Sequence, residues 1–158
     1  TDADVKANNE QRVWVGLLDI FGFEVFKINS LEQYCINYTN ERLQQLYISY
    51  VFKAEEEEFK KEGLGDFLFE LNFKDNQPII DLMDKHPTGI FHLLDEACSV
   101  AGTDDTLVQK IRTAHTKHSN FKIPKLTKDT FIIVHTAKDV EYTIGGFKTK
   151  NKGNLLIK

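Results

Sequence analysis

Cysteine is scarce in this sequence, which has only Cys35 and Cys98 among 158 residues. Neither has a second cysteine nearby, so a disulfide framework or a zinc site explains them less well than two buried, reduced thiols in an intracellular protein. Methionine occurs once, at Met83, so the sequence does not begin at an initiator methionine. We therefore interpret the chain as a fragment of a longer protein.

Long apolar runs and an excess of basic residues are also missing. No stretch is long enough to cross a bilayer and no signal peptide is visible, which predicts a soluble protein without a membrane span. The 20 basic residues are outnumbered by 24 acidic ones, whereas a nucleic-acid-binding domain normally carries a basic surface. We therefore expect no nucleic-acid partner. The hydrophobic share of 41% is enough for one globular core.

A metal site is the first alternative raised by the five histidines, because His115 and His118 are three residues apart. A zinc site needs a set of about four ligands, and no nearby Asp, Glu or Cys completes one. We expect both histidines at the end of a helix instead.

The most informative stretch is residues 18–24, LDIFGFE. It ends a near-continuous apolar run over residues 13–18, which predicts a strand buried on both faces of an α/β sheet. Asp19 would then lie at the carboxyl end of the strand, where P-loop NTPases place an Asp that helps to hold Mg²⁺. Gly22 would let its backbone N–H approach a phosphate. The same pattern also fits a polar turn after a strand, so the flanking residues decide.

Four further segments follow this loop in order. Together with it they resemble the motor domain of myosins, over most of the chain from about Val13 to Lys152. The segments are residues 29–46 (NSLEQYCINYTNERLQQL), 75–82 (DNQPIIDL), 87–98 (PTGIFHLLDEAC) and 146–152 (GFKTKNK).

The resemblance divides residues 1–158, as a partial motor domain, into four parts. Residues 12–28 would hold the strand and switch II, and residues 29–73 the relay helix and relay loop. Residues 74–128 would form the helix-loop-helix region of the lower 50-kDa subdomain, and residues 129–152 a β-hairpin region. We expect an α+β, mostly helical fragment of a P-loop NTPase motor domain.

Residue patterns predict the elements within these parts. A capping box of Ser30 and Gln33 opens a helix over residues 30–62, roughly 50 Å long. Its packed face would carry Ile36, Leu43, Tyr47, Tyr50 and Ala54, with Tyr34 and Tyr38 also packing. Shorter helices are expected at residues 79–84, 90–97 and from 104, the last two joined by residues 99–103, and a β-hairpin at residues 130–135 and 140–144.

The resemblance assigns catalytic roles to Asp19, Gly22 and Glu24, of which Asp19 and Gly22 would bind nucleotide. Asp19 would lie in the second shell of Mg²⁺, the Gly22 N–H would meet the γ-phosphate, and Glu24 would pair with an arginine of switch I. The sequence has neither a G-x-x-x-x-G-K-[ST] phosphate cradle nor a recognisable switch I. ATP and Mg²⁺ are therefore expected in the complete motor, and neither cofactor nor activity in the isolated fragment.

The helix-loop-helix is an ordinary core hairpin by its residues alone, but the resemblance implies an actin contact. Pro87 and Thr88 at the helix start, and Val100, Ala101 and Thr103 in the loop, would meet an apolar groove of actin. Val100 and Ala101 are small, which predicts a weaker anchor than a bulky aliphatic pair.

The resemblance implies a cytoplasmic, cytoskeletal motor whose partners are the actin filament and the rest of the motor domain, including P-loop, switch I and converter. The alternative is a non-catalytic actin-binding or interaction module, a pseudo-motor. Unpaired strand edges would favour self-association of the fragment. The relay loop lacks tryptophan, residues 136–138 (TAK) stand where many myosins have Tyr-Ala-Gly, and Gly153 replaces a usual Asp. These departures indicate a divergent, unconventional myosin.

Overall fold

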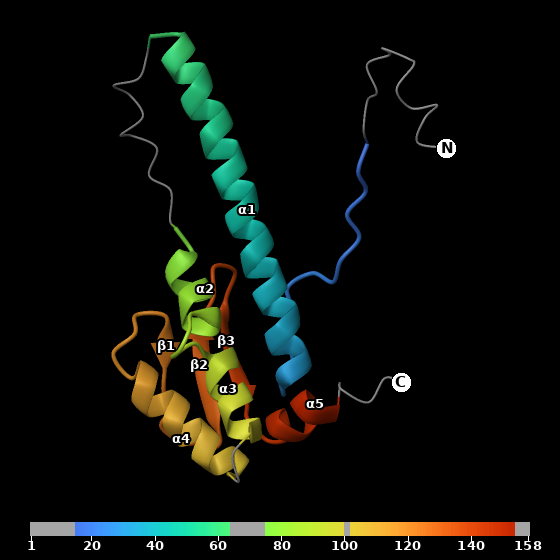
Figure 1. The fold of residues 1–158 in the computed structure, drawn as a ribbon, viewed down its shortest axis with the longest axis vertical. Helices are drawn as coiled ribbons and strands as arrows, with labels where there is room; N and C mark the ends of the chain where they lie inside the picture. Colours follow the sequence, from blue (N-terminus) through green and yellow to red (C-terminus); the bar gives the residue numbers. More distant parts are fainter. Residues whose placement is uncertain (1–14, 64–74, 100–101, 154–158) are drawn as a thin grey trace.

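The computed structural model describes residues 15–63, 75–99 and 102–153 (Figure 1). Its long helix stands beside a body made of short helices and a sheet (Figure 1). In chain order the elements are α1 (Leu31–Lys61), α2 (Gln77–Asp84), α3 (Ile90–Ser99), α4 (Asp104–His115), β1 (Phe121–Lys122), β2 (Thr130–Val134), β3 (Asp139–Thr143) and α5 (Phe147–Gly153).

The long helix α1 begins where the sequence predicts it. The Ser30 backbone N–H donates to Gln33 Oε1 at 3.0 Å, so the capping box is present. At 31 residues, α1 is about 46 Å long, and its second half projects beyond the other elements (Figure 1).

The packed face of α1 differs from the predicted one. Its buried residues are Leu31, Tyr34, Asn37 and Glu41, a stripe that is half polar. The predicted face is mostly unburied, since Tyr47 and Tyr50 are 65% and 75% exposed, whereas Tyr38 is half-buried. The apolar spacing predicted the helix correctly but its buried face wrongly. No other described element packs over the face that carries Tyr47 and Tyr50.

The sheet is a three-stranded antiparallel meander in the order β1-β2-β3. The predicted hairpin is present as β2 and β3, paired through Phe131 opposite Tyr142 and Ile133 opposite Val140. Strand β1 and helix α5 were not predicted. The start of α1 is tied to β3, because Thr143 N–H donates to the Asn29 carbonyl at 2.9 Å.

One hydrophobic core joins the sheet to the helices. The ring of Tyr34 lies at its centre and packs edge-on against Phe91 and Tyr142, with ring centroids 4.8 and 5.2 Å apart. Each fully buried side chain of this size contributes about 1.5–3 kcal/mol relative to an exposed one. Other fully buried members are Leu82, Met83, Ile90, Leu94, Leu107, Ile111, Phe131, Ile133, Ile144 and Phe147.

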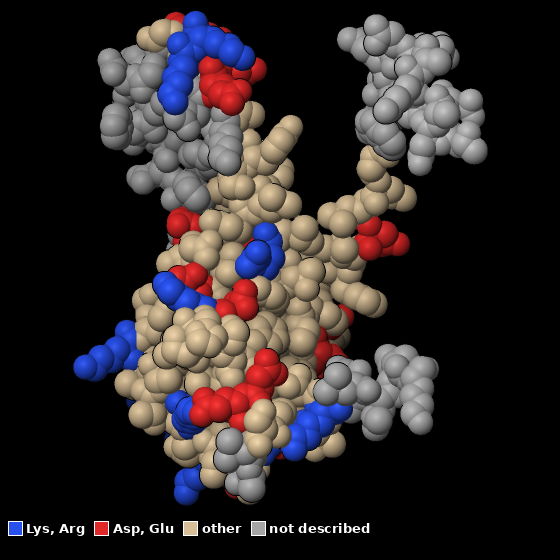
Figure 2. All heavy atoms as spheres, viewed as in Figure 1, with Lys and Arg blue, Asp and Glu red and all other residues tan. Residues whose placement is uncertain are grey.

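The predicted N-terminal strand is absent from the described part of its segment. Residues 15–18 belong to no strand, and Val15 and Leu17 are 91% and 95% exposed. A strand buried on both faces needs sheet neighbours, and the described sheet does not include this segment. The segment and the adjoining side of α1 present a mostly uncharged surface, whereas charges of both signs lie over the lower body (Figure 2).

The structure also bears on the expectations for the two cysteines, the helix-loop-helix and the relay loop. Cys35 is exposed on α1 rather than buried, whereas Cys98 is half-buried against the core. The helices α3 and α4 stand where the helix-loop-helix was predicted. The predicted relay loop from residue 64, and Val13, Trp14, Val100 and Ala101, lie outside the described residues.

Candidate functional site

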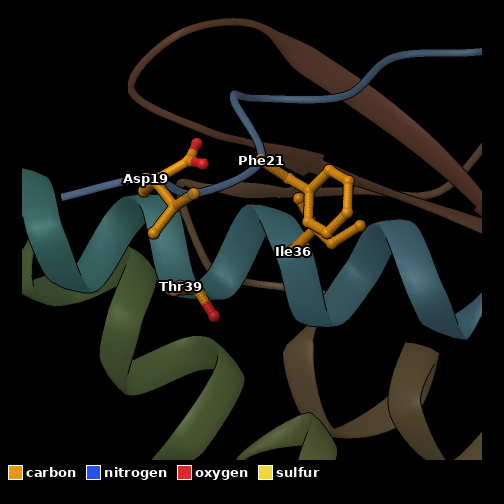
Figure 3. A pocket seen from close by; sticks show the side chains of 5 residues that line it. Asp19, Phe21, Ile36 and Thr39 are labelled. Carbon is orange, nitrogen blue, oxygen red and sulfur yellow. The ribbon is translucent and has the colours of Figure 1, made fainter.

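Residues 19–21 cross the outer side of α1 and border an open hollow. The hollow has a volume of about 490 Å³ and is lined by Asp19, Ile20, Phe21, Ile36 and Thr39. The Phe21 ring lies beside Ile36, and the Asp19 carboxylate points away from the helix (Figure 3). Asp19 is therefore free to meet a group that arrives from the other side of the loop.

Two asparagines of α1 hold the backbone of this loop. Asn40 Nδ2 donates to the Phe21 carbonyl at 3.1 Å. Asn37 makes a reciprocal pair with Glu24: the Glu24 N–H donates to Asn37 Oδ1, and Asn37 Nδ2 donates to the Glu24 carbonyl, both at 2.8 Å. Because both ends of the loop's turn are bonded to one helix, a shift of the loop must stretch these bonds or move α1.

The other two predicted site residues lie within this turn. Gly22 is exposed, and an added Cβ would meet no atom within 4 Å. The half-buried Glu24 accepts one bond from Gln33 Nε2 at 3.3 Å, which leaves capacity for a second partner on its carboxylate. The structure thus brings Asp19, Gly22 and Glu24 onto one short turn beside α1.

Behind the loop lies a buried carboxylate, Glu41, which is 2% exposed. Its oxygens accept from Thr136 N–H at 2.7 Å, Thr136 Oγ1 at 2.8 Å, Asn76 Nδ2 at 2.6 Å and His135 Nδ1 at 3.2 Å. Burial by itself raises the pKa of Glu41, but the hydrogen bonds from His135, Thr136 and Asn76 outweigh it and hold the pKa below its usual value. The group is therefore an ionised carboxylate that joins α1 to the hairpin and to the start of α2.

The network continues from Glu41 back to the loop. In the tautomer whose Nδ1 donates to Glu41, His135 Nε2 accepts from the Tyr142 hydroxyl at 2.8 Å, and that hydroxyl accepts from Asn37 Nδ2 at 3.0 Å. Burial raises the pKa of Tyr142, so its hydroxyl stays protonated. A continuous buried chain of hydrogen bonds therefore runs from the backbone of Glu24 through α1 to the hairpin.

The predicted actin-facing residues lie at opposite ends of α3. Pro87 and Thr88 are exposed just before it, and Thr103 is exposed at the N-cap of α4. Since α3 has ten residues, its ends are about 15 Å apart. Val100 and Ala101, which complete the predicted contact, lie outside the described residues.

The turn before α3 is fixed from two sides. His115 Nε2, at the end of α4, donates to the Thr88 carbonyl at 2.8 Å. An added Cβ on Gly89 would lie 2.5 Å from the Lys85 backbone nitrogen, so only glycine fits there. The exposed Thr88 is thus held in place by the buried His115. For His115 the sequence predicted a position at a helix end but no such contact.

Sequence reasoning missed the residues that hold the loop. Asn37, Asn40 and Glu41 were read as part of the long helix and His135 as part of a strand. A signal was available: polar residues three and four apart on α1 occupy the side of Tyr34 and Tyr38, where a helix packed on a sheet would carry apolar ones.

No metal centre or membrane span emerges from the parts of the chain that the structure describes. No three His, Cys, Asp or Glu side chains of residues 15–63, 75–99 and 102–153 group in a way that could hold a metal ion. Within the same ranges no helix combines the length and the apolar character needed to cross a bilayer.

Known proteins are similar to this chain over most of its length. Residues 2–158 match the family described as Myosin head (motor domain). Unconventional myosin-Vb of Homo sapiens is 48% identical over 147 residues, which cover 92% of this chain and 8% of the relative. Myosin-8 of Arabidopsis thaliana is 48% identical over 148 residues, with 93% and 10% covered, and unconventional myosin-Va of Homo sapiens is 49% identical over 148 residues, with 92% and 8% covered.

The chain spans only 8% to 10% of the length of these relatives. It is nevertheless matched almost from end to end, and the loop, the long helix and the hairpin all lie within the matched residues. The resemblance read from the sequence is confirmed: the chain belongs to the myosin head (motor domain) family.

Proposed function

We propose that this chain is the part of an actin-based, ATP-driven motor that couples a phosphate-sensing loop to α1 and to the actin-binding face. In the complete motor, Asp19, Gly22 and Glu24 form one wall of the ATP site. Residues 12–28 are then the strand and switch II, 29–73 the relay helix and loop, 74–128 the actin-binding helix-loop-helix region and 129–152 the hairpin region. The complete protein works on the cytoskeleton in the cytoplasm.

The observation that carries this proposal is that Asn37 and Asn40 are hydrogen-bonded to the backbone of the loop. The amide groups bond the backbone at Glu24 and Phe21, so the loop cannot shift toward a nucleotide without pulling on α1. Because α1 extends well beyond the core (Figure 1), a small rotation at its base becomes a larger displacement at its far end. Positioning dominates phosphoryl transfer, so the same shift controls hydrolysis.

The residues of the loop fit the cofactors of such a motor. The exposed carboxylate of Asp19 would hold a water of the Mg²⁺ shell. The open space around the exposed Gly22 would let its backbone N–H approach the γ-phosphate. The Mg²⁺ ion would neutralise charge that develops on the phosphates. Glu24 keeps a free acceptor position for an arginine from another part of the motor.

Actin recognition is assigned to the two ends of α3. Pro87 and Thr88 form one contact, and Val100, Ala101 and Thr103 form the other. The exposure of Pro87, Thr88 and Thr103 and the firm hold on Thr88 by His115 support this assignment, since a binding surface gains affinity when it is ordered beforehand.

Single-turnover kinetics of Glu24→Ala in the complete motor test the proposal. We expect ATP binding to persist and hydrolysis to fall about 100-fold, because the loop can no longer close around the attacking water. Glu62→Ala, which changes an exposed carboxylate at the far end of α1, serves as the matched control. Normal hydrolysis in Glu24→Ala would remove the switch role from the loop.

A further inference from the structure

The short helix α5 lies at the base of the molecule, beneath the start of α1 and beside α3 (Figure 1). It packs against both helices. Neither the predicted switch loop nor the predicted actin contact includes it, although it contacts the elements that carry both.

One side of α5 holds the start of α4 and the residue that leads into it. Lys148 Nζ donates to the Gly102 carbonyl. The Asp104 carboxylate, in the first turn of α4, accepts from the backbone N–H groups of Gly146 at 2.7 Å and Lys148 at 3.4 Å. The predicted actin residue Thr103 therefore lies between two positions that are bonded to α5.

The other side of α5 holds the start of α1. Lys150 Nζ donates to Glu32 Oε2 at 2.7 Å and to Ser30 Oγ at 2.8 Å. The bond from Lys150 is the largest cause of a lowered pKa of Glu32. Asn151 adds a bond to Asp95 of α3 at 2.9 Å.

Lys148 and Lys150 are two residues apart on one helix, so their side chains do not face each other and reach different neighbours. We infer that α5 is a strut that sets Gly102 and Thr103 relative to the start of α1, with Lys148 and Lys150 as positioning residues for activation by actin. This inference rests on the proposed function. Through these two lysines, α5 connects the start of α1 directly to Gly102 on the actin-facing side. This connection is separate from the buried network around Glu41.

The chain offers a matched control for both lysines. Lys152 lies on the same helix, is exposed, and makes no hydrogen bond or ion pair with another described residue. Lys150 and Glu32 are themselves 41% and 55% exposed, and exposed ion pairs contribute little to stability. Removing them should therefore leave the fold intact.

The test compares Lys148→Ala, Lys150→Ala and Lys152→Ala in the complete motor by steady-state ATPase at rising concentrations of actin filaments. For Lys148→Ala and Lys150→Ala we expect the maximal actin-activated rate to fall by about 2- to 30-fold, the range in which residues outside two sites alter their coupling. The rate without actin should change less. Lys152→Ala should match the wild type, and Lys148→Arg should restore activation.

A double-mutant cycle separates the strut from a simple loss of charge. If Lys150 acts through Glu32, then Glu32→Gln should weaken activation alone but add little to Lys150→Ala. Equal rates for the Lys148, Lys150 and Lys152 variants would overturn the inference while leaving the proposed function in place. A wild-type motor that actin does not activate would instead overturn the proposed function, and the strut with it.

Discussion

The carboxylate of Glu41 in α1 lies 3.2 Å from His135 Nδ1 at the end of β2, although 94 residues separate the two in sequence. Both side chains are almost completely buried. The contact fixes the long helix to the hairpin close to the point where Asn37 and Asn40 hold the loop.

Replacement of Glu41 by alanine should lower the free energy of unfolding of the chain by about 3–5 kcal/mol, because it leaves the buried donors of His135, Asn76 and Thr136 without their acceptor. Urea denaturation measures the change. Glu57→Ala removes an exposed carboxylate of the same helix and should cost less than about 0.5 kcal/mol. Similar losses in the two variants would show that the buried network does not stabilise the fold.

The hydroxyl of Thr136 should contribute to the same junction. Its Oγ1 donates to Glu41 Oε2 at 2.8 Å. A hydrogen bond to a charged group is worth about 1.5–3 kcal/mol, so Thr136→Val should lose about that much while keeping the side-chain shape. Thr136→Ser retains the hydroxyl and should lose less. A Thr136→Val variant as stable as the wild type in urea would contradict this role.

Stability should fall as the pH drops below about 6.5, partly because of His115. Burial lowers the pKa of His115 and outweighs the bond to Thr88, and the neighbouring His118, whose own pKa is lowered by burial, acts in the same direction. Since the folded state resists protonation, the unfolded state binds more protons in this range and is favoured as the pH falls. The slope is at most about 1.4 kcal/mol per pH unit for each group.

His115→Gln isolates this contribution, because glutamine can still donate to the Thr88 carbonyl but does not titrate. Denaturation curves at about pH 7.5 and pH 5.5 should show a smaller loss of stability in the variant than in the wild type. The lowered pKa values of Glu32, Glu41 and Asp81 act in a more acidic range and leave this comparison unaffected. An unchanged pH dependence would assign the effect to other groups.

The apolar residues before α1 should make the 158-residue chain associate with itself. Val15, Leu17 and Phe21 are 91%, 95% and 73% exposed, and Tyr47 and Tyr50 of α1 are exposed as well. Sedimentation velocity should show oligomers that decrease when Leu17 and Phe21 are both changed to Ser. Leu126→Ser removes an equally exposed residue elsewhere, at 97%, and should not do so. A clean monomer of the wild-type chain would contradict the prediction.

Local patterns predicted the elements whose signals lie within one segment. The capping box of Ser30 and Gln33 and the strand-like run over residues 130–135 depend on near neighbours, and α1 and the β2–β3 hairpin stand where they were expected. Helix α5 was missed because its seven residues include three lysines and only one core residue, Phe147. A polar helix of that length has no periodic apolar stripe to detect.

The candidate site was predictable only where one turn holds it. Asp19, Gly22 and Glu24 are close in sequence and remain close in space. The partners of Glu41 come from positions 35 to 95 residues away, and a sequence without a known fold does not reveal which distant polar groups share a buried space. The strand predicted over residues 13–18 is absent from the described residues 15–18 for a related reason. An apolar run of this kind needs strands on both sides, and the described sheet does not include this segment.

The movement of α1 in response to nucleotide tests the central claim most directly. Pulsed electron paramagnetic resonance can measure the distance between spin labels at Lys61, at the far end of α1, and Lys138, in the hairpin turn, in the complete motor. Adding an analogue of the hydrolysis transition state should shift this distance in the wild type and in Gln44→Ala, an exposed amide of α1 with no hydrogen bond to another described residue. In Asn40→Ala, which frees the Phe21 carbonyl, the shift should be lost or reduced. An equal shift in Asn40→Ala and the wild type would contradict the account.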